Sequence, residues 1–223
     1  VTARVGDPHV KVFREERELT VMLLVDVSAS LGFGTRSQTK RDLVTEACAT
    51  LAFSAIGNND KVGLVAFTDT IELTIPPAKG SSHVLRVIRE ILAYRPAHAG
   101  TDIAGALDYL ANITSKRCVV FLISDFQDEG CESPLRAVAK KHDMIAISLS
   151  DPHELELPDA GFITLQDAET GEWQAIDTGS AVVRNQFRQL GAARRELLRS
   201  QLIAVGTDQI DVSVGADDYI LDL

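Results

Sequence analysis

Residues 19–30, which read L-T-V-M-L-L-V-D-V-S-A-S, decide the fold of this chain. Five consecutive apolar residues, from Val21 to Val25, run directly into a carboxylate and two hydroxyls. An unbroken apolar run of this kind predicts a strand buried on both faces, as in a parallel sheet covered by helices. We therefore expect Asp26 at the carboxyl end of the strand, which is where open α/β sheets bind ligands.

The polar pattern after this strand is D-x-S-x-S, formed by Asp26, Ser28 and Ser30. One carboxylate and two hydroxyls at alternate positions of a tight loop can direct their oxygens at a single centre. Oxygen ligands without histidine or cysteine suit a hard divalent cation, Mg²⁺ first and Mn²⁺ or Ca²⁺ next. The simpler interpretation is that Asp26 and Ser28 cap the following helix, and the pattern alone leaves both open.

Two later segments extend the pattern. Thr101 stands at the start of a predicted helix, and Asp125 follows a second apolar strand over 118–123. If that strand lies beside the first one, Asp125 and Asp26 share one edge of the sheet, although each new residue could also be an ordinary cap. The predicted ligands for one octahedral cation are Asp26, Ser28, Ser30, Thr101 and Asp125, with water or a partner completing the shell.

Strands and helices alternate along most of the chain, which predicts a three-layer, Rossmann-like α/β fold with a mainly parallel sheet and helices on both faces. The strand over 71–75 follows Lys61–Phe67 so closely that the two must form an antiparallel hairpin. Pro76 and Pro77 are expected to end this edge strand. The other expected elements are helices over 35–57, 81–92, 101–113, 132–143 and 179–205, strands over 144–149 and 210–214, and a hairpin of 162–167 with 172–177.

Composition narrows the class of protein. The formal net charge of −10 argues against a general nucleic-acid binder and against docking on an anionic membrane. No apolar run approaches the roughly 18 residues that a membrane span needs. The three cysteines, Cys48, Cys118 and Cys131, are odd in number and scattered, so we expect reduced thiols and a cytoplasmic location. Because Val1 is not a start methionine, we expect the chain to be part of a longer protein.

The combination of D-x-S-x-S, G-T-D and a strand ending in S-D resembles the von Willebrand factor type A (vWA) domain with its metal-ion-dependent adhesion site (MIDAS). The flanking segments V-K-V-F-R-E-E-R-E-L-T-V, S-D-F and D-A-E-T-G-E-W resemble the bacterial DUF58 branch of these domains. One small departure is Leu31, where the family pattern leads us to expect methionine. The predicted division is an arm over 1–18 and a vWA-like domain over 19–223, with its core at 19–150 and the late hairpin, long helix and last strand at 160–223.

The resemblance implies a function as well as a fold. It implies that Asp26, Ser28, Ser30, Thr101 and Asp125 bind Mg²⁺ or Mn²⁺, with Asp102 in support. It implies a non-enzymatic protein–protein interaction module, in which the cation accepts an Asp or Glu of a partner protein. The DUF58 branch is commonly associated with MoxR-type AAA+ ATPases, so such an ATPase is the expected partner, in the assembly or maturation of other proteins.

Two other functions stay open. A bound Mg²⁺ could serve a phosphoester-processing enzyme, but the sequence shows no general base beside the predicted ligands, since His98 is the only histidine close to one. A purely structural vWA scaffold with an empty site is the other alternative. Neither a nucleotide-binding motif nor the G-x-S-x-G of an α/β-hydrolase occurs.

The last third of the chain offers two surfaces. The long helix is expected to turn an apolar stripe inward and to leave its Arg and Glu residues solvated. The stripe comprises Val183, Phe187, Leu190, Leu197 and Leu198. Trp173, near the tip of the late hairpin, either anchors a partner or packs on the long helix.

Overall fold

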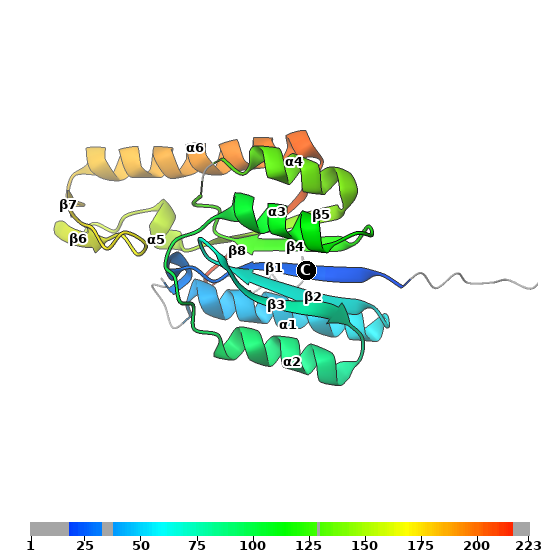
Figure 1. Ribbon diagram of the computed structural model, residues 1–223. Helices are drawn as coiled ribbons and strands as arrows, with labels where there is room; N and C mark the ends of the chain where they lie inside the picture. The colour runs from blue at the N-terminus through cyan, green and yellow to red at the C-terminus, as the bar shows by residue number, and fades with distance from the viewer. Residues whose placement is uncertain (1–17, 33–37, 129, 216–223) are drawn as a thin grey trace, which may run out of the picture.

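A mixed six-stranded sheet forms the centre of the molecule, a computed structural model that describes residues 18–32, 38–128 and 130–215 (Figure 1). The strands lie in the order β3-β2-β1-β4-β5-β8, and every neighbouring pair is parallel except β2 and β3. The strands are β1 (Thr20–Asp26), β2 (Lys61–Phe67), β3 (Ile71–Ala78), β4 (Val119–Ser124), β5 (Asp143–Ser150) and β8 (Asp208–Ser213). The predicted fold class, with its antiparallel edge strand, is confirmed.

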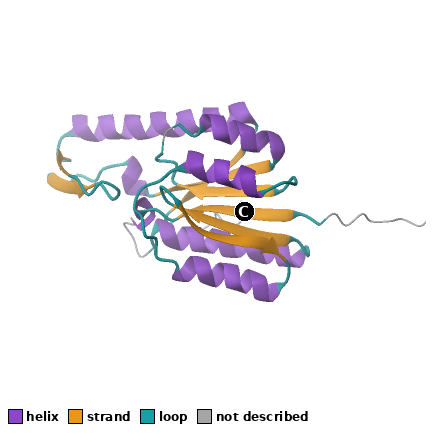
Figure 2. Cartoon of the chain, in the orientation of Figure 1, coloured by secondary structure: helices purple, strands orange, loops and turns teal. Residues whose placement is uncertain are grey.

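Helices cover both faces of this sheet (Figures 1 and 2). One face carries α1 and α2, and the other carries α3, α4 and α6. The helices are α1 (Lys40–Gly57), α2 (Ser81–Ala93), α3 (Ile103–Ile113), α4 (Glu132–Lys141) and α6 (Ala181–Val205), with two short ones, η2 (Ala29–Gly32) and α5 (Pro152–Leu155). A separate two-stranded sheet pairs β6 (Phe162–Gln166) with β7 (Trp173–Asp177), antiparallel.

The alternation of β1 side chains explains the two layers of core. Leu23 and Val25 belong to the cluster that packs against α1 and α2, whereas Met22 and Leu24 belong to the cluster with α3, α4 and α6. All four side chains are essentially inaccessible to solvent. A strand with apolar residues at every position is therefore stable only where helices bury both of its faces.

The structure differs from the sequence-based expectations at several boundaries. β3 continues through Pro76 and Pro77 to Ala78, because an edge strand tolerates proline where the missing N–H would face away from the sheet. The helix expected over 35–57, with Ser37 or Thr39 as its possible start, begins at Lys40 after the capping box of Thr39 and Asp42, so Thr39 is the start found. The short helix α5 was not expected. Residues 1–17 of the predicted arm over 1–18, together with residues 33–37, lie outside the described residues.

The inward face of α6 was predicted partly wrongly. Leu190 and Leu197 are 71% and 58% exposed, while Leu202 is fully buried. The predicted stripe was too wide, because only its members Val183, Phe187 and Leu198 are partly buried and lie on the flank of Leu202. The first part of α6 also extends beyond the central sheet, toward the β6–β7 hairpin (Figure 1). The expectation of a largely solvated, charged outer face is correct.

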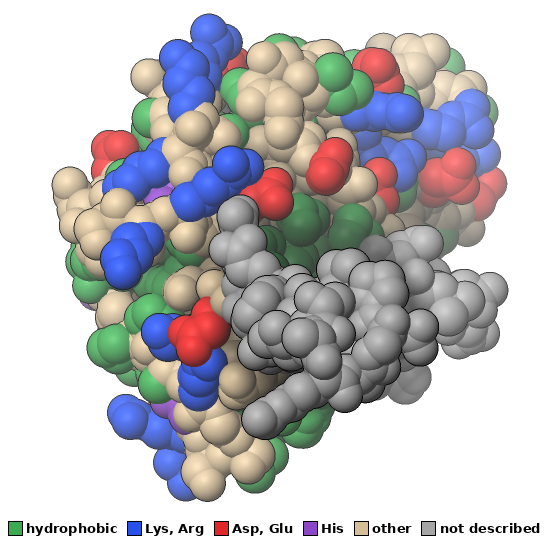
Figure 3. Space-filling model, turned by 90° about the vertical axis from the view of Figure 1, so that its right-hand side faces the viewer, with side chains coloured by type: hydrophobic (Ala, Val, Ile, Leu, Met, Phe, Trp, Pro, Cys, Tyr) green, Lys and Arg blue, Asp and Glu red, His purple; other side chains and the backbone are tan. Residues whose placement is uncertain are grey.

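Lysine and arginine side chains gather on the end of the molecule that Figure 3 shows, at the amino ends of the parallel strands. The residues at these ends include Lys61 at the start of β2, Lys116 and Arg117 before β4, and Lys140 and Lys141 at the end of α4. The carboxyl ends of the same strands, at the opposite end, carry the acidic residues predicted to bind a cation.

Candidate metal centre

The order in which strands are added to the sheet reverses at β1: the next strand in sequence, β2, lies on one side of it, and β4 lies on the other. β1 pairs with β2 on one side and with β4 on the other, so the loops after β1 and β4 leave the sheet side by side. This is the switch point where open α/β sheets form ligand sites. Asp26 ends β1, and Asp125 directly follows β4, so the predicted proximity of these two carboxylates at one sheet edge is found.

Asp26 is completely buried and accepts hydrogen bonds at both carboxylate oxygens. The Ser28 N–H donates to Oδ1 at 2.8 Å, and the Ser124 hydroxyl donates to Oδ2 at 2.7 Å. Burial, together with the negative charge of Asp125, raises the pKa of Asp26 to about 6, although the hydrogen bonds from Ser124 and Ser28 oppose the rise. The charged form of this carboxylate is therefore disfavoured chiefly by its burial, and the neighbouring charge of Asp125 adds to the effect.

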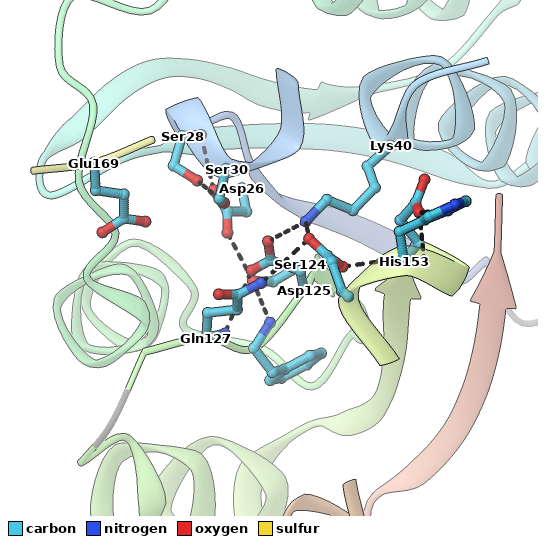
Figure 4. Close-up of polar contacts among 12 residues, drawn as sticks. Asp26, Ser28, Ser30, Lys40, Ser124, Asp125, Gln127, His153 and Glu169 are labelled. Atoms are coloured by element: carbon cyan, nitrogen blue, oxygen red, sulfur yellow. Dashed lines mark hydrogen bonds and ion pairs between the residues drawn. The ribbon is translucent and has the colours of Figure 1, made fainter. Parts of the chain in front are cut away.

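The first loop brings its two hydroxyls together beside Asp26. The Oγ atoms of Ser28 and Ser30 lie 3.0 Å apart, and both residues are buried. Figure 4 shows them on the same side of the cluster as Asp26. Of the predicted ligands, Asp26, Ser28 and Ser30 thus form one continuous group of oxygens.

Asp125 has a different partner. Its Oδ2 lies 2.7 Å from Nζ of Lys40, and the two side chains are 1% and 0% exposed. The same ammonium lies 2.6 Å from Oε1 of Glu154 in α5. Burial alone lowers the pKa of Lys40, but the charges of Asp125 and Glu154 outweigh it and raise the pKa, so the side chain stays protonated. A protein ammonium therefore already neutralises one carboxylate of the candidate site (Figure 4).

The S-D-F segment after β4 is locally strained. Phe126 has a φ of 52°, which is uncommon for a residue with a bulky side chain. Its N–H donates to Oγ of Ser124 at 3.1 Å, and its ring is buried in the core. Packing of the ring and this hydrogen bond together hold the backbone in a conformation that turns Asp125 toward Lys40.

The loop before α3 is held at the site by backbone bonds. The N–H of Ala29 donates to the carbonyl of Ala99 at 3.0 Å, which joins the loop after β1 to the loop before α3. Glu72 accepts from the N–H groups of Ala97 and His98 and from the Tyr94 hydroxyl. These bonds fix the segment that leads into Thr101.

Thr101 lies at the end of this fixed segment, but its hydroxyl points to a later part of the chain. The Oγ1 of Thr101 donates a hydrogen bond to Oε1 of Glu169 at 2.8 Å. Asp102 is the N-cap of α3, accepting from the Gly105 N–H at 2.8 Å. The structure thus does not bring Thr101 into the hydrogen-bonded group of Asp26, and it gives Asp102 a capping role.

Sequence reasoning missed Lys40, Ser124 and Glu154. A signal existed for Lys40, because a lysine in the first turn of a helix opposes the helix dipole. Lys40 also shares the buried face of α1 with Leu43 and Ala47, at helical spacing. Ser124 was visible as a polar residue ending an apolar strand. Glu154 had a signal that was overlooked, because D-P-H-E at 151–154 is a capping box with proline in the first turn of a helix.

The chemistry of the donor set fits a hard cation. Asp26, Ser28, Ser30, Asp125 and Thr101 offer only oxygens, which Mg²⁺ and Mn²⁺ prefer. The pKa of Asp26 is raised mainly because the carboxylate is buried, and secondarily by the charge of Asp125. Within the described residues there is no cluster of three His, Cys, Asp or Glu side chains suited to a metal, so such a cation would depend on the hydroxyls.

Comparison with known proteins places the chain in a family. A family model described as "Protein of unknown function DUF58" matches residues 1–197. The chain belongs to the DUF58 family. The predicted membership of DUF58 is therefore confirmed.

A curated relative supports the assignment to DUF58. The chain is 37% identical over 198 residues to "Uncharacterized protein Rv1480" of Mycobacterium tuberculosis, and the match covers 87% of this chain and 62% of that protein. The same values hold for "Uncharacterized protein Mb1516" of Mycobacterium bovis. The chain thus spans less than two thirds of the length of these relatives.

Solved structures show the same fold at low identity. An aerotolerance-related membrane protein from Bacteroides fragilis aligns over 92% of this chain and 94% of its own, with a TM-score of 0.59 and 15% identity. The SpRpn10 VWA domain aligns over 92% and 93%, with a TM-score of 0.50 and 13% identity. This DUF58 chain therefore has a vWA-like fold. In the part of the chain that the structure describes, none of the helices combines the length and apolar character needed to cross a membrane.

Proposed function

We propose that this DUF58 chain is a cation-dependent protein-docking module. Mg²⁺, or alternatively Mn²⁺, would be held by Asp26, Ser28, Ser30, Thr101 and Asp125, and a partner protein would add an Asp or Glu. The observation that carries the proposal is the meeting of Asp26, Ser28, Ser30 and Ser124 in one buried hydrogen-bonded group, beside Asp125, at the switch point of the sheet.

Electrostatics supports a cation at this place. Asp26, Asp125 and Glu154 bring three carboxylates to the site, and Lys40 brings one ammonium. A divalent cation beside Asp26 and Asp125 would balance the remaining charge. It would also provide a charge-assisted link to a carboxylate, which two acidic surfaces could not make without it.

The partner in this proposal is a MoxR-type AAA+ ATPase, acting with the module in the assembly or maturation of other proteins. Support for this partner comes from membership of DUF58 and from the vWA-like fold. We also propose a cytoplasmic location and no enzymatic activity.

A metal-independent scaffold is the second candidate, and Lys40 favours it. Its ammonium already occupies one side of Asp125, as a cation would. In that case the buried ion pair would join α1, β4 and α5 without any ligand. The two candidates differ in whether the fold responds to added Mg²⁺ or Mn²⁺.

The test is a calorimetric titration of Mg²⁺ and Mn²⁺ into wild type, Asp26→Ala and Asp125→Ala. The docking proposal expects about one ion per wild-type chain and none in either variant, followed by capture of the ATPase that chelator abolishes. Asp143→Ala, an exposed carboxylate at the start of β5 and so at the opposite end of the sheet from the predicted ligands, is the matched control and should bind like wild type. Full capture by the Asp26 variant, or capture that chelator does not change, contradicts the proposal.

A further inference from the structure

The tip of the β6–β7 hairpin reaches Thr101, one of the predicted ligands of the candidate metal centre. Glu169 lies in the turn between the two strands, and its Oε1 accepts the Thr101 hydroxyl at 2.8 Å. The residues that meet here are 68 positions apart in sequence. In Figure 4, Glu169 and Lys40 stand on opposite sides of Asp26, so this carboxylate approaches from the side that Lys40 does not occupy.

The turn itself is ordered by its own hydrogen bonds. Asp167 Oδ1 accepts from the N–H groups of Glu169 at 2.9 Å and Thr170 at 2.8 Å. These bonds hold the pKa of Asp167 below its usual range. Gly171 has a φ of +73°, which permits the tight return into β7. Glu169 is therefore presented from a defined turn.

The hairpin has little else to keep it in place. Every residue from 164 to 175 is exposed, including Trp173 at 67%, so the outer half of the hairpin has no core of its own. Its base is fixed, because Thr178 bonds Gly161 and Arg184 bonds the Thr178 carbonyl. A two-stranded hairpin without a buried face is marginally stable alone, so the tip can move about its fixed base.

Charge alone does not explain why Glu169 lies here. Asp26, Asp125 and Glu154 are acidic, and Lys40 is already engaged by two of them. A fourth carboxylate at this edge is favourable where a cation lies between it and the other oxygens.

We propose that Glu169 is the chain's own acidic ligand for the metal centre, and that the hairpin excludes a partner's carboxylate until its tip swings away. This inference rests on the proposed function, since it assumes a cation at Asp26 and Asp125. It adds a ligand that the MIDAS resemblance does not supply. It also makes docking a competition between an internal carboxylate and an external one.

The chain contains its own reporter for this contact. Trp173 is the single tryptophan, it stands at the start of β7, and it is exposed. Mn²⁺ is added to wild type, Glu169→Gln and Glu172→Gln, with free Mn²⁺ followed by electron paramagnetic resonance and the hairpin by Trp173 fluorescence. Glu172→Gln is the matched control, because it removes an exposed carboxylate from the same turn without touching Thr101.

The expected result is that wild type and Glu172→Gln bind one Mn²⁺ with a change in Trp173 fluorescence. Glu169→Gln should bind it about tenfold more weakly, since it loses a charged ligand, and its fluorescence should not respond. Acetate, used as the competing carboxylate, should reverse the fluorescence change in wild type and leave Glu169→Gln unchanged.

The outcomes separate the two proposals. If Glu169→Gln binds Mn²⁺ and changes its fluorescence like wild type, the internal ligand is disproved while the metal centre stands. If wild type itself binds no Mn²⁺, both the internal ligand and the proposed function fail.

Discussion

Nζ of Lys40 lies 2.7 Å from Oδ2 of Asp125, and both side chains are buried. The pair joins the first turn of α1 to the end of β4, two segments that are 85 positions apart in sequence. Because a buried ion pair is costly to break and weakly stabilising to form, its presence at the candidate metal centre is better explained by positioning than by stability. It holds Asp125 at the edge of the sheet in the absence of a cation.

Replacing Lys40 with methionine should destabilise the fold in chelator by about 3–5 kcal/mol, because Asp125 is left as an unpaired buried charge. Added Mg²⁺ should recover part of this loss, since the cation compensates the same carboxylate. Thermal unfolding with and without Mg²⁺ measures both effects. Lys61→Met, which removes a partly exposed partner of Glu18, is the control and should cost about 1 kcal/mol or less. A Lys40 variant as stable as wild type in chelator would contradict this account.

Asp26→Asn should have opposite effects on stability and on cation binding. The pKa of Asp26 is raised to about 6, so at pH 8 the folded state holds an unfavourable charge that asparagine lacks. In chelator at pH 8 the variant should be more stable by about 1–3 kcal/mol, whereas Mg²⁺ should no longer raise its melting temperature. Chemical denaturation in chelator and in Mg²⁺ tests both parts, and a destabilised variant in chelator would count against the first.

His142 should make the fold acid-sensitive. It is buried, and its Nδ1 accepts the Cys118 N–H at 3.3 Å. Burial, with Lys141 and Arg117 nearby, lowers its pKa. Because the folded state keeps the ring neutral while the unfolded chain protonates near pH 6.5, stability is present above that pH and is lost as the pH falls toward the lower folded pKa.

The variant His142→Gln removes this proton uptake. Its stability should therefore fall less steeply than that of wild type between about pH 7.5 and pH 5.5, the range set by the ordinary histidine pKa. Urea denaturation at several pH values measures the two slopes. Parallel slopes would show that His142 does not carry the acid sensitivity.

Gly105→Ala should disturb the entry into α3. A Cβ at this position would lie 2.3 Å from Oδ2 of Asp102, the side chain that caps the helix, so the cap must shift. We expect a loss of about 1–2 kcal/mol, the usual cost of a lost N-cap, and weaker cation binding because Thr101 precedes the cap. Gly57→Ala is the matched control, since its Cβ would meet open space. Equal melting temperatures for the two variants would refute this.

The sequence alone was sufficient to predict where in the sheet the candidate metal centre lies. It was not sufficient to predict all the side chains that meet there. An unbroken apolar run can be buried only between two helical layers, so the central place of β1 was predictable, whereas its pairing with β4 was only assumed and is found in the structure. Lys40 was not predicted, because its partner Asp125 lies far along the chain. Glu154 was missed because a four-residue helix carries almost no periodicity. Leu190 was placed inward because apolar spacing does not show that the first part of α6 projects past the sheet, and Leu197 because the predicted stripe was drawn too wide.

The Thr101–Glu169 contact was also beyond prediction. The turn of D-A-E-T-G-E-W was evident from its glycine and its flanking strands. The direction in which the hairpin points depends on how Thr178 and Arg184 fix its base, and on the angle between the hairpin and α6. Spacing in sequence carries no information about such an angle.

The oxygens at the edge of the sheet come from residue 26, from residues 101 and 125, and from residues 154 and 169, so nearly the whole chain must fold before they meet. Parallel neighbours of β1 are reached only through long crossovers, which makes such contacts slow to form. A newly made or partly unfolded chain would therefore have no high-affinity place for the cation. Binding of Mg²⁺ would then favour only the completed domain, and occupancy would report whether folding has finished.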